Sequence, residues 1–299
     1  MLSILIPVYN YDITNLIYEI HEQATLAKIE FEIICLDDKS NEDILKANLV
    51  VNELDNVLYK TSERNNGIAI TRQHLCDSAK YDWILLIDAD TELKDKTFIP
   101  NYLDVINSGF NVIFGGISYK NNKPDKKSLL RWKYGKQFEE VTAKKRNRRP
   151  YKRTSAANIL IKKKLYQRFS LDSIGNSYGM DIFFGPQLKL NNIPVLHINN
   201  GVYHLGLEKS ATYIKKTQRA VETLLNLHYQ KKIKLHENGL LKSFLFFKKI
   251  KLNFIFSLWY KLFKNLMTLN LLSSNPSTKT LQAYKISYMC FFDLSNSTD

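Results

Sequence analysis

The sequence predicts an α/β fold, with a sheet flanked by helices and a helical C-terminal region. Short apolar runs alternate with segments of helical spacing over the first 95 residues, which is the pattern of βαβ units that build a parallel sheet. One such run, residues 83–87, stops at Asp88 and Asp90. Five apolar residues suit a buried strand and are too few for a typical helix. Because α/β proteins bind ligands beyond the carboxyl ends of their strands, we expect the functional site there.

The individual elements follow from the same periodicities. Strands are expected at residues 2–9, 31–36, 57–59, 83–88, 112–119, 157–161 and 194–198, the last leading to Val202-Tyr203-His204. Helices are expected at residues 13–27, 42–54 and 68–79, and from about residue 209 to the end. Residues 120–153 are polar and basic, and we predict a mobile loop there.

Size and cysteine content narrow the class of protein. A chain of 299 residues with 44% hydrophobic residues is long enough and apolar enough for one large domain or two smaller ones. Its three cysteines are scattered without metal-ligand spacing, which favours a reducing compartment. The N-terminus lacks the basic start and the long apolar core of a signal peptide. We therefore expect a cytoplasmic protein.

Charge is distributed unevenly along the chain. Residues 1–95 contain 18 acidic and 8 basic residues, a formal charge of −10, whereas the whole chain carries +14; the remainder therefore carries +24. An acidic part can hold a metal ion, and a basic part can face phosphates or an anionic membrane. The basic run at 144–153 could clamp a diphosphate or a charged acceptor, or could simply be solvated. No nucleic-acid-binding motif accompanies these charges, and no nucleic-acid partner is expected.

Candidate ligands follow several of the predicted strands. Asn10 follows the first strand, Asp37 and Asp38 follow the second, and Asp88 and Asp90 follow the fourth. Parallel strands bring these ends to one edge of the sheet, where two acids can hold a divalent cation against a phosphate. Any one of these residues alone would more often form a turn or a helix cap. Their joint placement indicates a site.

A short glycine-containing segment precedes the acidic strand. Asn65-Asn66-Gly67 is followed by Arg72 on the next predicted helix. Glycine permits a close approach of the backbone to a ligand, and Arg72 could reach a phosphate. The alternative is a plain turn followed by a surface arginine.

Taken together, these motifs resemble the nucleotide-sugar half of family 2 glycosyltransferases. Residues 4–10, residues 36–43, Asn65-Asn66-Gly67 with Arg72, and residues 87–90 follow in the same order and spacing over roughly the first 95 residues. The resemblance implies the GT-A fold, a Rossmann-like mixed sheet flanked by helices. It also implies a catalytic domain at 1–205, with a nucleotide-sugar half at 1–95 and an acceptor half at 96–205, and a basic amphipathic helical region at 206–299.

The resemblance also assigns roles to residues of the first half. Asp38 would meet the base of the nucleotide, and Asp88 with Asp90 would form the Asp-x-Asp motif that holds the sugar nucleotide and its metal, Mn²⁺ or Mg²⁺. The residues expected to bind the donor are Pro7, Tyr9, Asn10, Asp38, Asn66, Gly67, Arg72, Asp88 and Ala89. A UDP-sugar is the expected donor, because UDP is the commonest nucleotide in that family.

In the second half the resemblance is looser. Asp181 stands where the catalytic base is expected, but Met180 stands in the place of the usual glutamate. His204 is similar in position to a histidine of bacterial members and is expected to be a third metal ligand with Asp88 and Asp90, or to contact the phosphate; a purely structural histidine is the alternative. The Gln-x-x-Arg-Trp motif of processive synthases is missing, because Ser128 stands where glutamine would precede Arg131 and Trp132.

The reaction implied is an inverting, metal-dependent sugar transfer to an acceptor hydroxyl, with Asp181 as general base. The acceptor would be a glycan or a lipid-linked molecule in bacterial surface polysaccharide or glycolipid synthesis. One rival is a sugar-phosphate nucleotidyltransferase, although that class opens with a glycine-rich, arginine-containing loop where this chain has Pro7-Val8-Tyr9-Asn10. A second rival is a catalytically inactive, membrane-associated glycan-binding scaffold, which Met180 keeps open.

The C-terminal part carries a further pattern. Residues 240–267 contain six lysines, no acidic residue and a dense set of apolar and aromatic side chains. The longest charge-free piece there, residues 252–260, is too short to span a bilayer, which needs about 20 apolar residues. A basic amphipathic segment of this kind is typical of a helix lying on anionic lipid, so we expect peripheral contact with the inner face of the bacterial cytoplasmic membrane. The alternative is a helix packed on the core with solvated lysines.

Overall fold

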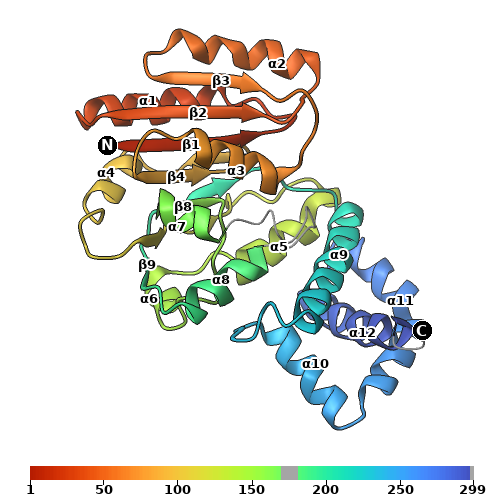
Figure 1. The fold of residues 1–299 in the computed structure, drawn as a ribbon. Helices are drawn as coiled ribbons and strands as arrows, with labels where there is room; N and C mark the ends of the chain where they lie inside the picture. Colours follow the sequence, from red (N-terminus) through yellow and green to blue (C-terminus); the bar gives the residue numbers. More distant parts are fainter. Residues whose placement is uncertain (170–180, 297–299) are drawn as a thin grey trace. The chain divides into compact units, whose positions relative to one another are not determined.

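The computed structural model describes residues 1–169 and 181–296, and Figure 1 shows their fold. The chain separates into two compact units. The first unit comprises Met1–Ser118, Glu140–Asn176 and Asn191–Gly206, and the second comprises Tyr119–Glu139, Ser177–Leu190 and Leu207–Asp299. The predicted division into residues 1–205 and 206–299 stays a prediction.

A seven-stranded mixed sheet forms the core of the first unit. Its strands lie in the order β3-β2-β1-β4-β8-β6-β9. Their bounds are β1 Leu2–Val8, β2 Phe31–Asp37, β3 Val57–Thr61, β4 Trp83–Ile87, β6 Val112–Phe114, β8 Asn158–Lys162 and β9 Val195–His197. The first four strands are parallel, whereas β8 runs antiparallel to both β4 and β6. The predicted α/β fold with a mixed sheet is confirmed.

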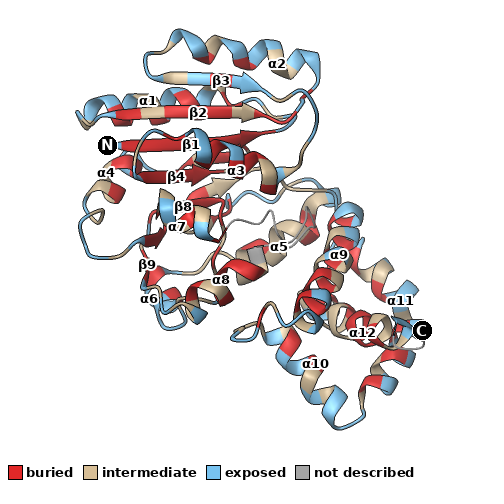
Figure 2. Cartoon of the chain, in the orientation of Figure 1, coloured by how far each residue is buried: buried red, intermediate tan, exposed pale blue. Residues whose placement is uncertain are grey.

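Apolar strands and amphipathic helices account for this core. Every residue of β1 and β4 is buried, as continuous apolar runs in a covered sheet should be. The helices of this part are α1 Thr14–Leu26, α2 Glu42–Asn48, α3 Ile68–Ser78, α4 Phe98–Leu103, α6 Ala143–Asn147 and α7 Lys163–Arg168. Helix α1 buries Leu16, Ile17 and Ile20 at helical spacing, and the side chain of Asn41 caps α2 by accepting from the Ile44 amide. Figure 2 shows the central strands as an almost continuous buried layer.

A second, three-stranded sheet joins distant parts of the first unit. Strand β10 Val202–His204 pairs antiparallel with β5 Thr91–Leu93 and parallel with β7 Ile117–Ser118. In this register His204 lies opposite Thr91. The residue that follows Asp90 is therefore fixed beside a histidine from far along the chain.

The prediction of a mobile loop at residues 120–153 is wrong. The segment contains a 3₁₀ turn at Lys126–Ser128 and two helices, α5 Leu129–Phe138 and α6 Ala143–Asn147. The prediction failed because lysines and arginines greatly outnumber the few apolar residues that pack these helices against the protein. Leu129 and Leu130 of α5 and Ala143 of α6 are buried.

Arg146 on α6 is not available for a diphosphate clamp. Its guanidinium donates to the backbone carbonyls of Val141, Phe114, Gly115 and Ile198, at 2.6 to 3.2 Å. A further contact of 2.8 Å joins Arg146 Nη1 to His197 Nδ1. Arg146 thus ties α6 to the ends of β6 and β9, which is a structural role.

The second unit is helical, as predicted for the C-terminal part. It contains α5, α8 Asp181–Leu190, α9 Ser210–Tyr229, α10 Gly239–Lys249, α11 Asn253–Leu271 and α12 Thr278–Asn296. Helix α12 packs against α9, α10 and α11. Among the described residues, no helix is both long and apolar enough to cross a bilayer.

Candidate functional site

Asp38 is the first predicted site residue with a defined role in the structure. It follows β2 directly and is only 4% exposed. Its two carboxylate oxygens accept hydrogen bonds from the backbone amides of Asn66 and Gly67, each at 2.7 Å. Gly67 has a φ of 84°, which a glycine adopts without strain. The structure thus brings together Asp38, Asn66 and Gly67, as the sequence predicts, and Asp38 shapes the loop that leads into α3.

The neighbouring Asp37 is structural. One of its carboxylate oxygens accepts from the Ser40 amide at 2.6 Å and the other from the Tyr59 hydroxyl at 2.6 Å. Burial, and then this bond to Asp37, raise the pKa of Tyr59. These bonds hold the turn after β2, which leaves Asp38 as the acid of this pair that faces the 66–67 loop.

The end of β1 presents Tyr9 and Asn10. The Asn10 amide donates to Ser40 Oγ at 2.7 Å, and Asn10 Oδ1 accepts from the Asn41 amide at 2.9 Å. Asn10 therefore joins the ends of β1 and β2. Tyr9 is 56% exposed, so its ring is open to a ligand, whereas Pro7 is buried within the strand.

Asp88 pairs with Arg72. Arg72 Nη2 donates to Asp88 Oδ1 at 2.5 Å, and the two side chains are 6% and 25% exposed. The Thr91 hydroxyl donates to the Asp88 carbonyl at 2.7 Å and so fixes the turn between β4 and β5. Arg72, predicted to reach a phosphate, contacts an acid of the same site, and its contact with a phosphate stays a prediction. Ala89 lies in the turn between Asp88 and Asp90.

Asp90 faces His204. Asp90 Oδ1 lies 3.5 Å from His204 Nδ1, and the two side chains are 29% and 16% exposed. The Leu205 amide donates to the Asp90 carbonyl at 2.8 Å. A Cβ on Gly206 would lie 1.9 Å from Asp90 Oδ2, so this position tolerates only glycine while Asp90 keeps its place.

Two residues near Asp90 were not anticipated from sequence. Gly206 is one, because the lack of space for a side chain there arises only from the contact with Asp90 in the folded protein. Tyr11 is the other: burial raises its pKa, and the next largest cause is the nearby charge of Asp90. Tyr11 directly follows the predicted Asn10, so its position in the sequence was the available signal.

The residues present fit a divalent cation held jointly by protein and substrate. A carboxylate and an imidazole are suitable ligands for Mn²⁺, and Mg²⁺ commonly binds through one or two carboxylates plus phosphate oxygens. Asp90 and His204 supply such a pair, whereas Asp88 is engaged by Arg72. No group of three potential ligands occurs within residues 1–169 and 181–296. The role of Asp88, Asp90 and His204 as three ligands of one metal ion stays a prediction.

The predicted base lies partly outside the described residues. Asp181 begins helix α8, but its side chain is not described, and Met180 falls in the segment that the structure leaves out. The role of Asp181 stays a prediction.

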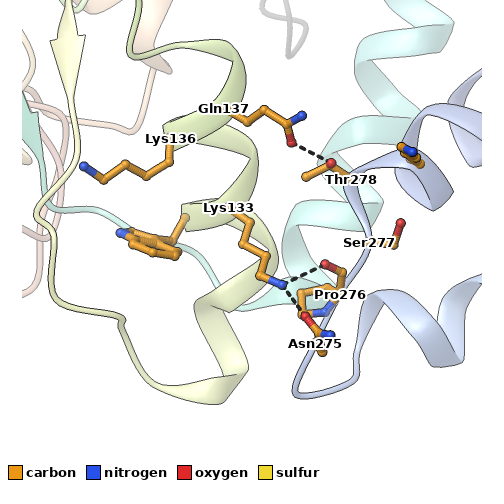
Figure 3. Close-up of a pocket in the computed structure, with 9 residues that line it drawn as sticks. Lys133, Lys136, Gln137, Asn275, Pro276, Ser277 and Thr278 are labelled. Atoms are coloured by element: carbon orange, nitrogen blue, oxygen red, sulfur yellow. Dashed lines mark hydrogen bonds between the residues drawn. The ribbon is translucent and has the colours of Figure 1, made fainter.

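A cavity of about 400 Å³ lies within the second unit and contains none of the predicted site residues. Trp132, Lys133 and Lys136 of α5 line one side, and residues 275–279 line the other (Figure 3). Its polar groups largely satisfy one another: Lys133 Nζ donates to Asn275 Oδ1 at 2.5 Å, and the Thr278 hydroxyl donates to Gln137 at 2.6 Å. We interpret this cavity as a packing gap between α5 and the start of α12, not as a ligand site.

Several solved structures have a similar fold. The structure of S. aureus TarS 1-349 with UDP-GlcNAc is similar with a TM-score of 0.52 and 16% identity, over 99% of this chain and 92% of that one. Glucosyl-3-phosphoglycerate synthase from Mycobacterium tuberculosis, solved with Mn²⁺, UDP and glucosyl-3-phosphoglycerate, gives a TM-score of 0.51 and 14% identity over 80% of this chain and 82% of that one. The mannosyltransferase PcManGT from Pyrobaculum calidifontis, solved with GDP-Man and Mn²⁺, gives 0.51 and 14% over 76% and 64%.

The extent of these likenesses varies. Against two further TarS structures the chain spans 65% and 40% of their lengths. No match to the sequence is found among curated proteins. The sequence model of the family described as "Glycosyl transferase family 2" matches residues 3–174, which is more than half of the chain and contains Asp38, Asp88 and Asp90. The chain therefore belongs to glycosyl transferase family 2.

Proposed function

We propose that this protein transfers a sugar from a nucleotide-diphosphate donor to an acceptor hydroxyl. The observation that carries the proposal is the set of polar side chains at the carboxyl edge of the parallel strands: Asp38 with the 66–67 loop, Asp88 with Arg72, and Asp90 with His204. Solved neighbours bound to UDP-GlcNAc and to GDP-Man with Mn²⁺ support a sugar nucleotide as the ligand class. The family match favours transfer over the nucleotidyltransferase alternative.

In this proposal different residues at the strand ends bind different parts of the donor. Tyr9, being exposed, offers a ring face for the base. The Asp38 amide donates to the carbonyl of Val8, next to Tyr9, and the Asp38 carboxylate binds the Asn66 and Gly67 amides. Asp90 and His204 would hold Mn²⁺ or Mg²⁺, which when bound neutralises charge that develops on the leaving diphosphate. Arg72 holds Asp88 in place through their 2.5 Å ion pair, so that this acid would present its remaining lone pairs to the donor.

The second half of the reaction is assigned to Asp181. As general base it would take the proton from the acceptor hydroxyl, a role worth roughly 10²–10⁴-fold in rate. Attack from the face opposite the diphosphate gives inversion at the anomeric carbon. We place the acceptor among glycans or lipid-linked molecules of bacterial surface polysaccharide or glycolipid synthesis, with a UDP-sugar as donor.

Two variants separate the proposed roles. Donor affinity is measured by calorimetry with a panel of UDP- and GDP-sugars in Mn²⁺ or in chelator, and turnover by release of nucleoside diphosphate. We expect Asp90→Ala to abolish the metal-dependent part of donor binding. We expect Asp181→Asn to bind donor normally and to lose at least about 10²-fold in turnover. Asp104→Ala, an exposed acid on the same unit, is the control and should change neither.

Equal losses of donor binding in Asp90→Ala and Asp181→Asn would contradict this division of roles. A wild-type protein that binds a sugar nucleotide but releases no diphosphate, with or without acceptor, would instead support the inactive scaffold.

A further inference from the structure

Helix α11 carries its aliphatic side chains on the outside. Ile255, Leu258, Leu262, Leu266 and Leu269 recur at spacings of three and four and therefore share one face, here called the outer face. They are between 56% and 67% exposed. At about 1.5 Å of rise per residue, the outer face is a stripe roughly 20 Å long.

The opposite face of the same helix is more polar than the outer face. Helix α11 buries Asn253, Ser257 and Tyr260, together with Met267 and Leu271. Gln218 Nε2 donates to the hydroxyls of Tyr260 and Tyr284, at 3.2 and 2.9 Å. An amphipathic helix on a protein in water turns its apolar side inward. Helix α11 instead turns the five aliphatic residues of the outer face away from the protein, so that face is suited to an apolar environment.

Helix α10 extends this surface. Phe246 and Ile250 near its end are 57% and 45% exposed, and Phe254 and Trp259 of α11 are 61% and 48% exposed. The two helices are in contact, and Figure 2 shows exposed residues along both. Aromatic residues that keep part of the ring in contact with water are typical of the boundary between lipid tails and headgroups.

The charges around this surface are of one sign. No acidic residue occurs between Glu237 and Asp293. Of the six lysines at 240–267, Lys248 pairs with the buried Asp293. The other five are exposed: Lys242, Lys249, Lys251, Lys261 and Lys264. A surface that is both apolar and basic complements anionic lipid. A second copy of the chain meeting it face to face would set lysines against lysines.

We propose that the outer face of α11, with the exposed end of α10, docks on the interface of an anionic lipid bilayer. Helix α11 would lie along the membrane, because no helix among the described residues could cross it. Leucines and aromatic rings would enter the boundary region while the lysines contact headgroups. This proposal concerns the second unit and does not depend on the transfer reaction.

The test uses the full chain and flotation with vesicles of phosphatidylcholine alone or mixed with phosphatidylglycerol. We expect binding to the mixed vesicles only, and a loss of about tenfold or more in Leu262→Glu/Leu266→Glu. The matched control, Leu26→Glu/Leu49→Glu, changes the same number of exposed leucines on the first unit and should bind like wild type. Lys249→Gln/Lys251→Gln should lose about fivefold per lysine, and salt should weaken the wild type.

Light scattering after size-exclusion chromatography tests whether a second copy of the chain covers this face instead of lipid. A dimer that Leu262→Glu/Leu266→Glu converts to monomer, together with no vesicle binding by wild type, would overturn the proposal in favour of self-association. Equal vesicle binding by wild type and the outer-face variant would overturn it as well.

Discussion

Strand β4 and helix α11 are both rich in leucine and isoleucine, yet they place these residues oppositely. Every residue of β4 is buried beneath the layers of the first unit, whereas the aliphatic stripe of α11 is mostly exposed. The charged groups differ in the same way: the first unit encloses Arg146 in a cage of carbonyls, and the second displays most of the lysines of α10 and α11. Apolar content alone therefore does not tell core from contact surface; the neighbours of each side chain do.

The largest expected difference is between the effects on stability of removing a buried and an exposed positive charge. Arg146→Met removes the donor to four backbone carbonyls and leaves them buried, so we expect a loss of about 3–5 kcal/mol in the free energy of unfolding. Lys249→Met on α10 removes an exposed charge and should change stability by less than about 0.5 kcal/mol. Urea unfolding followed by circular dichroism measures both. Similar losses in the two variants would mean that Arg146 does not hold the end of the sheet.

The next contrast concerns the leucines themselves. Leu85 in β4 is fully buried and Leu262 on α11 is 63% exposed. Leu85→Ala should cost about 2–5 kcal/mol through lost contacts and a residual cavity. Leu262→Ala should be within about 0.5 kcal/mol of wild type in the absence of lipid. A large loss from Leu262→Ala in solution would show that the outer face packs against protein and would count against membrane docking.

The smallest contrast is a dependence on pH. Burial, and then the charges of Arg146 and Arg153, lower the pKa of His197 to about 4, although its bond to the Pro150 carbonyl opposes the shift. The unfolded chain binds this proton below about pH 6.5 and the folded chain does not, so stability is full above pH 6.5 and falls toward pH 4, by about 2–3 kcal/mol.

His197→Asn should remove this part of the pH dependence, measured by urea unfolding between pH 7.5 and pH 4. His236 of the second unit also has a lowered pKa but is less buried, so His236→Asn should remove less of it. If His236→Asn removed more of the pH dependence of stability than His197→Asn, the prediction that His197 makes the larger contribution would be wrong.

Much of the first unit follows from the sequence because local pattern and tertiary role agree there. The predicted helix at 68–79 appears as Ile68–Ser78, and the strand ending at Asp88 appears as Trp83–Ile87. The helices α5 and α6 were missed because their stability depends on a few buried positions among many charges, and on bonds such as those of Arg146 that no local pattern reveals.

For the site, chain order was enough to predict which side chains share an edge of the sheet. It did not predict how they pair. The bonds from the loop amides to Asp38 and from Arg72 to Asp88 join residues 16 to 29 positions apart in the sequence, which no local pattern reveals. The pairing of Asp90 with His204 depends on β10 returning beside β5, which is a contact between distant parts of the chain.

That return of β10 has a consequence for biosynthesis. The four parallel strands near the N-terminus can associate as soon as residue 87 has left the ribosome, because the pairs β1–β2, β2–β3 and β1–β4 need no later segment. Asp90 acquires its imidazole partner only after the segment up to Gly206 has emerged and paired with β5. The nascent protein thus passes through a stage that has the parallel strands but lacks the histidine beside Asp90, and contacts of such long range are the slow ones to form.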